Sequence, residues 1–395
     1  ATGYPLAYMS AKIGLGYTLP ELVNSITKVT TACFEPSLDY IVCKHPRWDF
    51  EKFELVNRNL GPTMKSVGEV MGIGRCFEES LQKSIRMLDI GKDGLVLNRS
   101  NGKTFDVEDI EQHLQSPDDY ILYYVAAALK KGISVEKIYQ LSAIDPWFIE
   151  KINNIVKMEE NLVKNDLDNK LLLHAKKIGF SDSQIGRAKN KTFNEIREMR
   201  KSFGIEPVVK QIDTLAAEWP AKTNYLYMTY GGTKHDISID EDDKGIMVLG
   251  AGPYRIGSSV EFDWGTVNMV WGLQENGEKN VTVVNCNPET VSTDYDICSR
   301  LFFEELTLER ILDIYEFENS KGIVTSVGGQ TANNLTPILA DNGVTLIGTS
   351  AQNIDRAENR SRFSETLDKL HIKQPLWQAF TSLNEAKNFA LEVEY

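Results

Sequence analysis

The stretch of sequence that decides the fold spans residues 246–264 and reads IMVLGAGPYRIGSSVEFDW. It opens on four apolar residues, which predict a short buried strand over 246–249. Two glycines follow at once, Gly250 and Gly252, and they predict a tight turn. Apolar residues then recur at helical spacing, so we predict a helix over 257–276. Together these signals predict a strand–turn–helix unit of a parallel sheet.

Strand-like runs and helical patterns alternate downstream of this unit. Apolar and β-branched runs predict strands at residues 281–284, 322–326 and 344–347. Helical patterns lie between them, at residues 307–317 and 331–341. Because helices regularly separate the strands, we predict an α/β domain with a parallel sheet and right-handed crossovers.

The glycine turn matches a dinucleotide-binding loop only in part. That loop has the spacing GxGxxG, but here Gly257 lies five positions after Gly252. Pro253 removes a backbone donor where a pyrophosphate would bind. An acidic residue is expected after the second strand to hold the ribose, and Asn285 stands there instead. A nicotinamide- or flavin-dependent oxidoreductase is therefore a disfavoured alternative.

Charged residues fall where the carboxyl ends of the predicted strands would form a crevice. Glu261 and Asp263 lie in the first turns of the first helix, and Glu289 follows the second strand. The two glutamates could line the crevice, or they could be only a helix-start charge and a loop acid. Arg255 could meet an anion, although pairing with Asp263 is the more common outcome. Residues 328–330 predict a tight turn into a helix.

The region from about residue 90 to 244 is predicted to be all-helical. It opens on a polar stretch, residues 91–116, that we expect to be a loop or a weakly structured insert. Helix starts then follow one another, marked by the capping residues Ser134, Asp145 (with Pro146), Ser181 and Thr192. Trp147, Phe148 and Ile152 begin a long helix whose apolar face could serve a core or an interface.

Residues 1–89 mix extended and helical signals. Residues 38–44 are predicted to form a strand that ends before Pro46. Glycines within residues 64–74 permit close backbone approach or positive φ, and residues 77–87 have helical spacing. The chain opens without a methionine and ends directly after a helical stretch, so we expect an internal piece of a longer protein.

The composition is that of a soluble globular protein with several domains. Of the 395 residues, 42% are hydrophobic and 25% are charged, which is enough to bury real cores. The net charge of −13 gives no overall attraction to nucleic acid or to an anionic membrane. The five cysteines include no CxxC pair, so we expect neither a disulfide framework nor a zinc ribbon. We expect instead a reducing, cytoplasmic compartment.

Seven longer motifs follow one another along nearly the whole chain. They are ATGYPLA (1–7), FEPSLDY (34–40), MKSVGEVM (64–71), KQIDTLAAE (210–218), GSSVEFDW (257–264), NCNPETVSTDYD (285–296) and IDRAENR (354–360). In this order they resemble the large subunit, or synthetase region, of carbamoyl-phosphate synthase. The amino-acid sequence of residues 258–264 is more similar to that of the fused eukaryotic enzymes than to that of the bacterial subunit.

The resemblance implies four parts and a mixed fold class. Residues 1–89 would be the tail of a first ATP-grasp domain, of α+β type, which makes carboxyphosphate and carbamate. Residues 90–244 would be an all-α oligomerisation domain. Residues 245–365 would be a pre-ATP-grasp, Rossmann-like α/β domain, and residues 366–395 would begin a second, truncated ATP-grasp domain.

The resemblance also implies a ligase that makes carbamoyl phosphate for pyrimidine or arginine synthesis. The family uses bicarbonate, ammonia (often from glutamine) and two ATP, with Mg²⁺ or Mn²⁺ and possibly K⁺. It implies a glutamine amidotransferase partner and a homo-oligomer formed through the helical domain. Its location would be cytoplasmic or, alternatively, the mitochondrial matrix. We assign no catalytic, nucleotide-binding or metal-binding residue here, so we expect the chain alone to be inactive.

The resemblance implies that this chain contains part of an internal tunnel for carbamate. Matching motifs put Leu38, Glu69, Ser259, Glu261 and Glu289 on its wall, where Ser259 departs from a glycine of bacterial members. An enclosed route makes physical sense because carbamate decomposes in water. A stand-alone assembly scaffold, acting through the helical region, is the alternative from another functional class.

Overall fold

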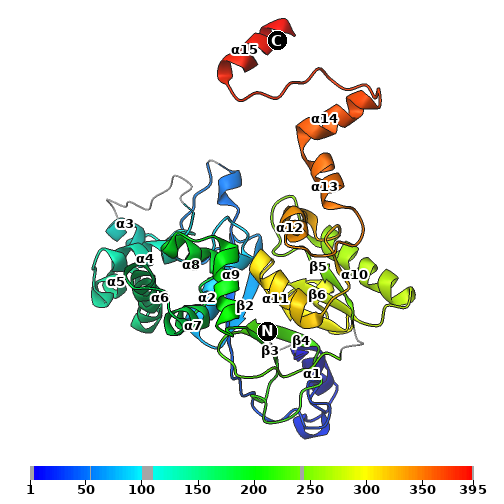
Figure 1. Cartoon of the computed structure of the whole chain (residues 1–395). Helices are drawn as coiled ribbons and strands as arrows, with labels where there is room; N and C mark the ends of the chain where they lie inside the picture. Colours follow the sequence, from blue (N-terminus) through cyan, green and yellow to red (C-terminus); the bar gives the residue numbers. More distant parts are fainter. Residues whose placement is uncertain (1–3, 54, 100–109, 241–243, 394–395) are drawn as a thin grey trace.

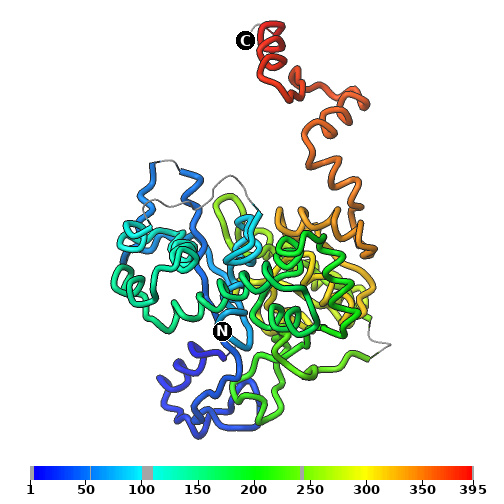
Figure 2. The backbone as a smooth tube through the Cα atoms, turned by 60° about the vertical axis from the view of Figure 1, so that its left-hand side comes forward, coloured from blue at the N-terminus to red at the C-terminus, as the bar shows by residue number. Residues whose placement is uncertain are grey.

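The protein is described by a computed structural model that covers residues 4–53, 55–99, 110–240 and 244–393. Its class is mixed, as predicted: a two-stranded sheet, a group of helices and a six-stranded sheet follow one another along the chain (Figure 1). The last helices extend from the body as an arm, which both views show (Figure 2). No helix of the described segments is long and apolar enough to cross a membrane.

The first part of the chain is built on a two-stranded antiparallel sheet. β1 (Ile41–Arg47) pairs with β2 (Gly68–Gly74), and α2 (Phe77–Met87) packs against both strands. The prediction that the first strand ends before Pro46 is wrong, because Pro46 lies inside β1 opposite Glu69. Proline is tolerated there since β1 has only one neighbouring strand. The remaining elements of this part are α1 (Leu6–Gly14), η1 (Leu19–Glu21) and η2 (Phe50–Lys52).

A group of helices follows α2 and shares one apolar core with it. The helices are α3 (Ile110–Gln115), α4 (Ile121–Lys130), α5 (Val135–Ser142), α6 (Pro146–Lys164), α7 (Asn169–Lys177), α8 (Asp182–Lys189) and α9 (Phe193–Ser202). The four predicted caps are confirmed, because each capping side chain accepts a backbone N–H bond from the first turn. Such bonds satisfy helix donors that have no partner within the helix.

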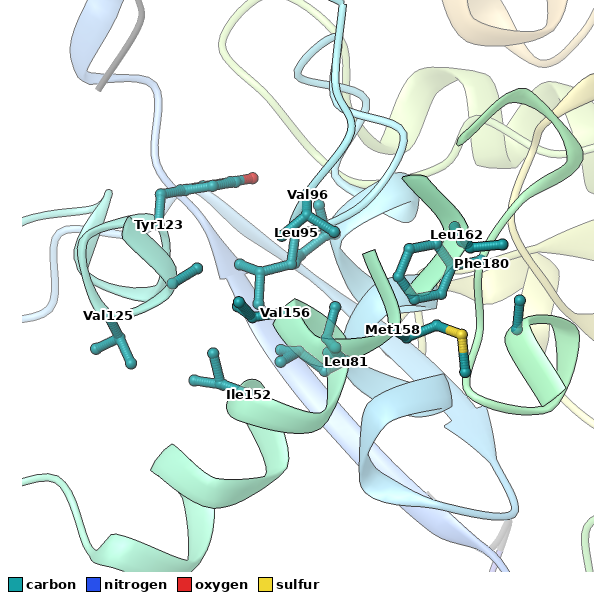
Figure 3. Packing of buried hydrophobic residues seen from close by; sticks show 14 of the residues in the cluster. Leu81, Leu95, Val96, Tyr123, Val125, Ile152, Val156, Met158, Leu162 and Phe180 are labelled. Carbon is teal, nitrogen blue, oxygen red and sulfur yellow. The ribbon is translucent and has the colours of Figure 1, made fainter. Parts of the chain in front are cut away.

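The core of these helices also takes in part of the stretch predicted to be a loop. Leu95 and Val96 are buried in it beside Leu81 of α2 and Val156 of α6 (Figure 3). Residues 110–115 of the same stretch form α3. The prediction of a loop over 91–116 is therefore wrong at residues 110–115, whereas residues 91–99 lie on no helix or strand and residues 100–109 lie outside the described segments.

The six-stranded sheet has the order β3-β4-β7-β6-β5-β8. Its strands are β3 (Val208–Gln211), β4 (Tyr225–Thr229), β5 (Ile246–Leu249), β6 (Val281–Asn285), β7 (Arg300–Phe303) and β8 (Gly322–Val324). Only β3 is antiparallel to its neighbour; the other pairs are parallel. The predicted parallel sheet is confirmed.

Three sequence predictions about strands need correction. β3 and β4 are strands within the region predicted to be helical, so that prediction is wrong over residues 208–229. β7 was not predicted at all. Residues 344–347 were predicted to form a strand but make only an isolated bridge, from Leu346 to Ile323. The domain boundaries at residues 89, 244 and 365 stay predictions.

Helices cover both faces of the six-stranded sheet. α10 (Val260–Glu275) packs on one face, together with Met71 and Ile73 of β2. α11 (Leu308–Glu318) and α12 (Gly329–Asp341) pack on the other face. The three predicted helices are thus confirmed. Outside these layers lie η3 (Val291–Thr293), α13 (Ala351–Glu358), α14 (Arg360–Lys369) and α15 (Leu383–Glu392), the last three forming the arm of Figure 1.

Candidate functional site

The strand order sets up a crevice at the carboxyl edge of the six-stranded sheet. β5 lies between β6 and β8. The loops after β5 and β8 therefore lead to helices on opposite faces, α10 on one and α12 on the other. In open α/β sheets ligands bind at such a switch point. Residues that contact a ligand in this fold are therefore expected at this edge of the sheet.

The glycine turn after β5 is packed too closely to hold a pyrophosphate. Gly252 has φ +73°, and its N–H donates to Asn285 Oδ1 at 3.1 Å. A Cβ on Gly328 would lie 2.6 Å from the carbonyl oxygens of Leu249 and Gly250. The turn after β8 thus rests directly on the turn after β5, and glycine is required for that approach. The predicted tight turn at 328–330 is confirmed.

Asn285, at the place where a dinucleotide site has an acid, is buried and fully used in the fold. Its amide nitrogen donates to Asp263 Oδ1 at 3.1 Å and to Ser292 Oγ at 3.0 Å. Ser292 in turn donates to Asp263 at 2.6 Å. Burial raises the pKa of Asp263, and these hydrogen bonds offset the rise. This arrangement ties α10 to the loop after β6 and leaves no ribose ligand.

Arg255 does not pair with Asp263, which is buried beneath the turn. Its guanidinium instead binds Asp89, from the linker after α2, with 2.9 Å between Nη1 and Oδ2. It also donates to Thr331 Oγ1 at 3.1 Å. The predicted pairing with Asp263 is therefore wrong. Sequence reasoning missed Asp89 because it lies 166 residues from Arg255 along the chain.

Ser259 and Glu261, both predicted to line the tunnel, meet at the start of α10. The backbone N–H of Ser259 donates to Glu261 Oε1 at 3.1 Å, and its hydroxyl lies 3.3 Å from Oε2. These bonds contribute to holding the pKa of Glu261 below its ordinary value. Glu261 is exposed, so its carboxylate is ionised and faces outward at the edge of the sheet.

Glu69 and Glu289, also predicted for the tunnel, are brought together by Lys44. The Lys44 ammonium lies 2.8 Å from Glu69 Oε1 and 3.0 Å from Glu289 Oε1. The pKa of Glu289 is lowered by this ammonium group. Lys44 was missed from the sequence, although it lies two residues before Pro46, which is opposite Glu69, and so faces the same side of β1.

Leu38 stands apart from both pairs. Its side chain is 46% exposed, just before β1. The neighbouring Ser37 N–H donates to Thr214 O at 2.9 Å. The two polar pairs are linked more closely, because Tyr254 in the glycine turn shares a 2.7 Å hydrogen bond with Thr290, next to Glu289. Four of the five predicted residues thus lie in two neighbouring places: Ser259 and Glu261 at the start of α10, and Glu69 of β2 with Glu289 of the loop after β6.

A layer of buried charges joins the helices to the six-stranded sheet. Lys83 of α2 binds Glu304 at 2.6 Å, and Arg86 binds Glu305 at 2.6 Å. Three further pairs join the helices to α11: Lys176 with Glu309, Arg200 with Asp313, and Arg197 with Asp313. Lys176 and Arg200 also both pair with Asp182 of α8. Sequence reasoning did not anticipate this layer, which fixes the two parts against each other.

Comparison with known proteins gives the family. The model of the carbamoyl-phosphate synthetase large chain oligomerisation domain matches residues 69–204. The model of the carbamoyl phosphate synthase preATP-grasp domain matches residues 242–356. The chain belongs to the carbamoyl-phosphate synthase large-chain family. The first matched segment spans most of β2 together with α2–α9, the second spans β5–β8, and β3 and β4 lie between them.

Curated proteins, two of them named as carbamoyl-phosphate synthases, are similar to this chain over its whole length. It is 51% identical over 400 residues to multifunctional protein URA2 of Saccharomyces cerevisiae, of which it covers 18%. It is 52% identical to the mitochondrial arginine-specific large chain of Neurospora crassa, covering 34%. It is 51% identical to the mitochondrial carbamoyl-phosphate synthase [ammonia] of Mus musculus, covering 26%. The match spans all of this chain but only about a fifth to a third of these relatives.

Proposed function

We propose that this chain is the central region of a carbamoyl-phosphate synthase, a ligase that forms carbamoyl phosphate from bicarbonate, ammonia and two ATP. The observation that carries the proposal is identity of 51–52% across the whole chain to the carbamoyl-phosphate synthases of Neurospora crassa and Mus musculus. Two family domains in the expected order support it. The test is carbamoyl-phosphate formation by the full-length protein that contains this chain. Absence of bicarbonate-dependent product would refute it.

Within that enzyme, we propose that the loops at the sheet edge guide carbamate between two ATP-using sites. Support comes from two pairs of polar side chains: Ser259 with Glu261 at the start of α10, and Glu69 of β2 with Glu289, which Lys44 brings together from distant parts of the sequence. Leu38 is proposed for the same wall. A protected route limits the loss of labile carbamate. Bulk added at Ser259 should block passage while leaving the nucleotide sites intact.

The cofactors of the reaction would be held by other parts of the enzyme. No group of three or more His, Cys, Asp or Glu side chains that could hold a metal ion occurs in the described segments. We therefore assign Mg²⁺, Mn²⁺, K⁺ and ATP to no residue of this chain and give these groups no step. We propose that the chain alone forms no carbamoyl phosphate. Bicarbonate-dependent ATP turnover above a heat-killed control would contradict this.

We propose two partners: a glutamine amidotransferase subunit or domain that supplies ammonia, and a second copy bound through the helical domain. The match to the oligomerisation-domain model supports the second. Trp147 and Phe148 on α6 are 50% and 44% exposed beside Phe77, whereas Ile152 is buried in the core. Light scattering of the Trp147→Ser chain should show weaker self-association. A monomer at every concentration, before any substitution, would sink this proposal.

The pathway and the compartment follow the relatives' names and stay proposals. The relatives include an arginine-specific and an ammonia-dependent mitochondrial synthase beside multifunctional proteins. We propose pyrimidine or arginine synthesis in the cytoplasm or in the mitochondrial matrix. A scaffold without enzymatic partners is the second candidate, favoured only by the exposed aromatic pair on α6. Localisation of the tagged full-length protein and growth without pyrimidine or arginine would separate these pathways.

A further inference from the structure

Lys44 of β1 lies between two residues of the proposed carbamate wall. Its ammonium group is 2.8 Å from Glu69 Oε1 and 3.0 Å from Glu289 Oε1. The register of the first sheet explains this position, because Lys44 and Pro46 share one side of β1 and Pro46 is opposite Glu69. Glu289 reaches the same ammonium group from the loop after β6. Two wall residues that lie far apart in the sequence therefore meet at one cation.

A backbone hydrogen bond holds β2 against this loop without the help of Lys44. The N–H of Met71 in β2 donates to the carbonyl oxygen of Cys286 at 3.0 Å. Within the loop, the N–H of Glu289 donates to Asn287 Oδ1 at 3.0 Å. Because these bonds involve the backbone, the two glutamates should stay close together when the ammonium group is removed.

The proposed wall is strongly anionic apart from Lys44. Three of the residues proposed for it are carboxylates: Glu69, Glu261 and Glu289. Backbone N–H groups lower the pKa of Glu261, and a hydrogen bond from Lys44 lowers the pKa of Glu289, so both are ionised at neutral pH. Carbamate is also an anion, and like charges repel. Carboxylates alone would therefore oppose its passage.

The Lys44 ammonium group can contact an anion while it holds both glutamates. An ammonium group has three N–H donors, and Glu69 and Glu289 use two of them. The side chain of Lys44 is 56% exposed, so the third donor is open to a solute. Carbamate accepts hydrogen bonds through its carboxylate oxygens and donates them through its N–H groups. It can therefore bond to the ammonium group and to a neighbouring glutamate at once.

The balance of charge around Lys44 favours passage over trapping. One ammonium group faces two carboxylates, so the attraction for an anion is partly offset. A solute that moves through a protein must be bound strongly enough to enter and weakly enough to leave.

We propose that Lys44 is a further residue of the carbamate route, where its ammonium group binds a carboxylate oxygen of the passing carbamate between Glu69 and Glu289. This proposal rests on the proposed function, since it assigns a role to Lys44 on that same route. Exposed ion pairs contribute little to the stability of a fold. Removal of the ammonium group should therefore affect passage far more than folding.

The test is the amount of ATP hydrolysed per carbamoyl phosphate formed by the full-length protein that contains this chain. Lys44→Met keeps the length of the side chain and removes its charge. Loss of one charge-assisted hydrogen bond should slow the passage of carbamate about tenfold, so the ratio should rise. Lys44→Arg keeps the charge and the donors, and it should return the ratio close to that of the unmodified protein.

The matched control is Lys321→Met. Lys321 pairs with Glu278 and is 51% exposed, but it lies just before β8, at the opposite edge of the six-stranded sheet. This substitution also removes an exposed ion pair, and it should leave the ratio unchanged. Circular dichroism checks that each variant is folded.

Ser259→Phe, measured in the same assay, separates this proposal from the one on which it rests. A ratio that rises with Ser259→Phe but not with Lys44→Met overturns the role of Lys44 and leaves the route in place. A ratio that neither substitution changes overturns the route, and the role of Lys44 with it. An equal rise with Lys44→Met and Lys44→Arg, or with Lys321→Met, shows that the charge at this position is not the cause and also overturns the proposal.

Discussion

Replacing Arg200 by methionine should destabilise the protein strongly, because it removes a central cation of the buried charge layer. The side chain is fully buried. Its guanidinium lies 3.2 Å from Asp182 Oδ2 and 3.1 Å from Asp313 Oδ1, and it donates to the carbonyl of Ile205 at 3.2 Å. Methionine fills similar space but offers no donor, so these acceptors lose a charged partner.

The expected loss follows from what remains around the two carboxylates. Breaking one side of a buried ion pair costs about 3–5 kcal/mol. Lys176 still lies 2.8 Å from Asp182, and Arg197 still lies 2.6 Å from Asp313. We therefore expect the lower end, about 3 kcal/mol of unfolding free energy. Burial already raises the pKa of Asp182, so protonation at lower pH should reduce the loss.

Denaturant unfolding, followed by circular dichroism, measures this free energy. The matched control is Lys201→Met on the same helix, where Lys201 makes an exposed ion pair with Glu316 at 2.7 Å. That substitution should cost less than about 1 kcal/mol, as surface pairs usually do. If Arg200→Met lowers the free energy of unfolding no more than Lys201→Met does, the buried charge layer does not hold the helices to the sheet.

Three further predictions concern the sheet edge and β1. Burial lowers the pKa of His45 from 6.5 to about 4. Between these two pH values the unfolded chain binds more protons than the folded one, so the free energy of unfolding should fall as the pH drops from 6.5 to about 4. The free energy of unfolding of His45→Asn should lack this dependence on pH. Asn285→Leu removes one donor to the buried Asp263 and the acceptor of the Gly252 N–H, and it should cost about 1–3 kcal/mol. Denaturant unfolding measures this cost, and an unchanged midpoint would contradict the prediction. Lys44→Met should raise the pKa of Glu289 toward its ordinary value, because the ammonium group is the main cause of the lowering; carboxyl NMR titration with no shift would count against that.

Helix starts could be predicted from the sequence because their signals are local. The hydroxyl of Ser134 accepts a hydrogen bond from the N–H of Lys137, three residues further on, and the side chains of Thr192 and Glu195 bond to each other's backbone. Neither depends on distant parts of the chain. The same holds for the strand and turn at 246–252, whose apolar run and glycines lie next to each other.

Features that depend on distant partners could not be predicted in this way. β4 is a short strand whose parallel partner, β7, lies more than 70 residues further along the chain, and β3 is joined to the sheet by pairing with β4. Lys83 and Arg200 lie on amphipathic helices, and from the sequence alone such charged residues are expected to face solvent. In the structure they are buried and pair with Glu304 and Asp313 of the sheet region.

The role of the candidate site stays a prediction, and its arrangement could not be derived from the sequence. Family motifs supplied Glu69, Ser259, Glu261 and Glu289, and the fold brings them together in two pairs, one at the start of α10 and one around Lys44. Lys44, which joins two of them, carries no motif signal, because the register between β1 and β2 decides what it meets.

The most direct test of carbamate passage is the amount of ATP hydrolysed per carbamoyl phosphate formed by the full-length protein carrying Ser259→Phe. The added ring should obstruct the route beside Glu261, so bicarbonate-dependent hydrolysis should continue while product formation falls, and the ratio should rise. Ser259→Gly, which adds no bulk, should keep the ratio of the unmodified protein. A ratio that Ser259→Phe leaves unchanged, with both activities intact, would show that carbamate does not pass this residue.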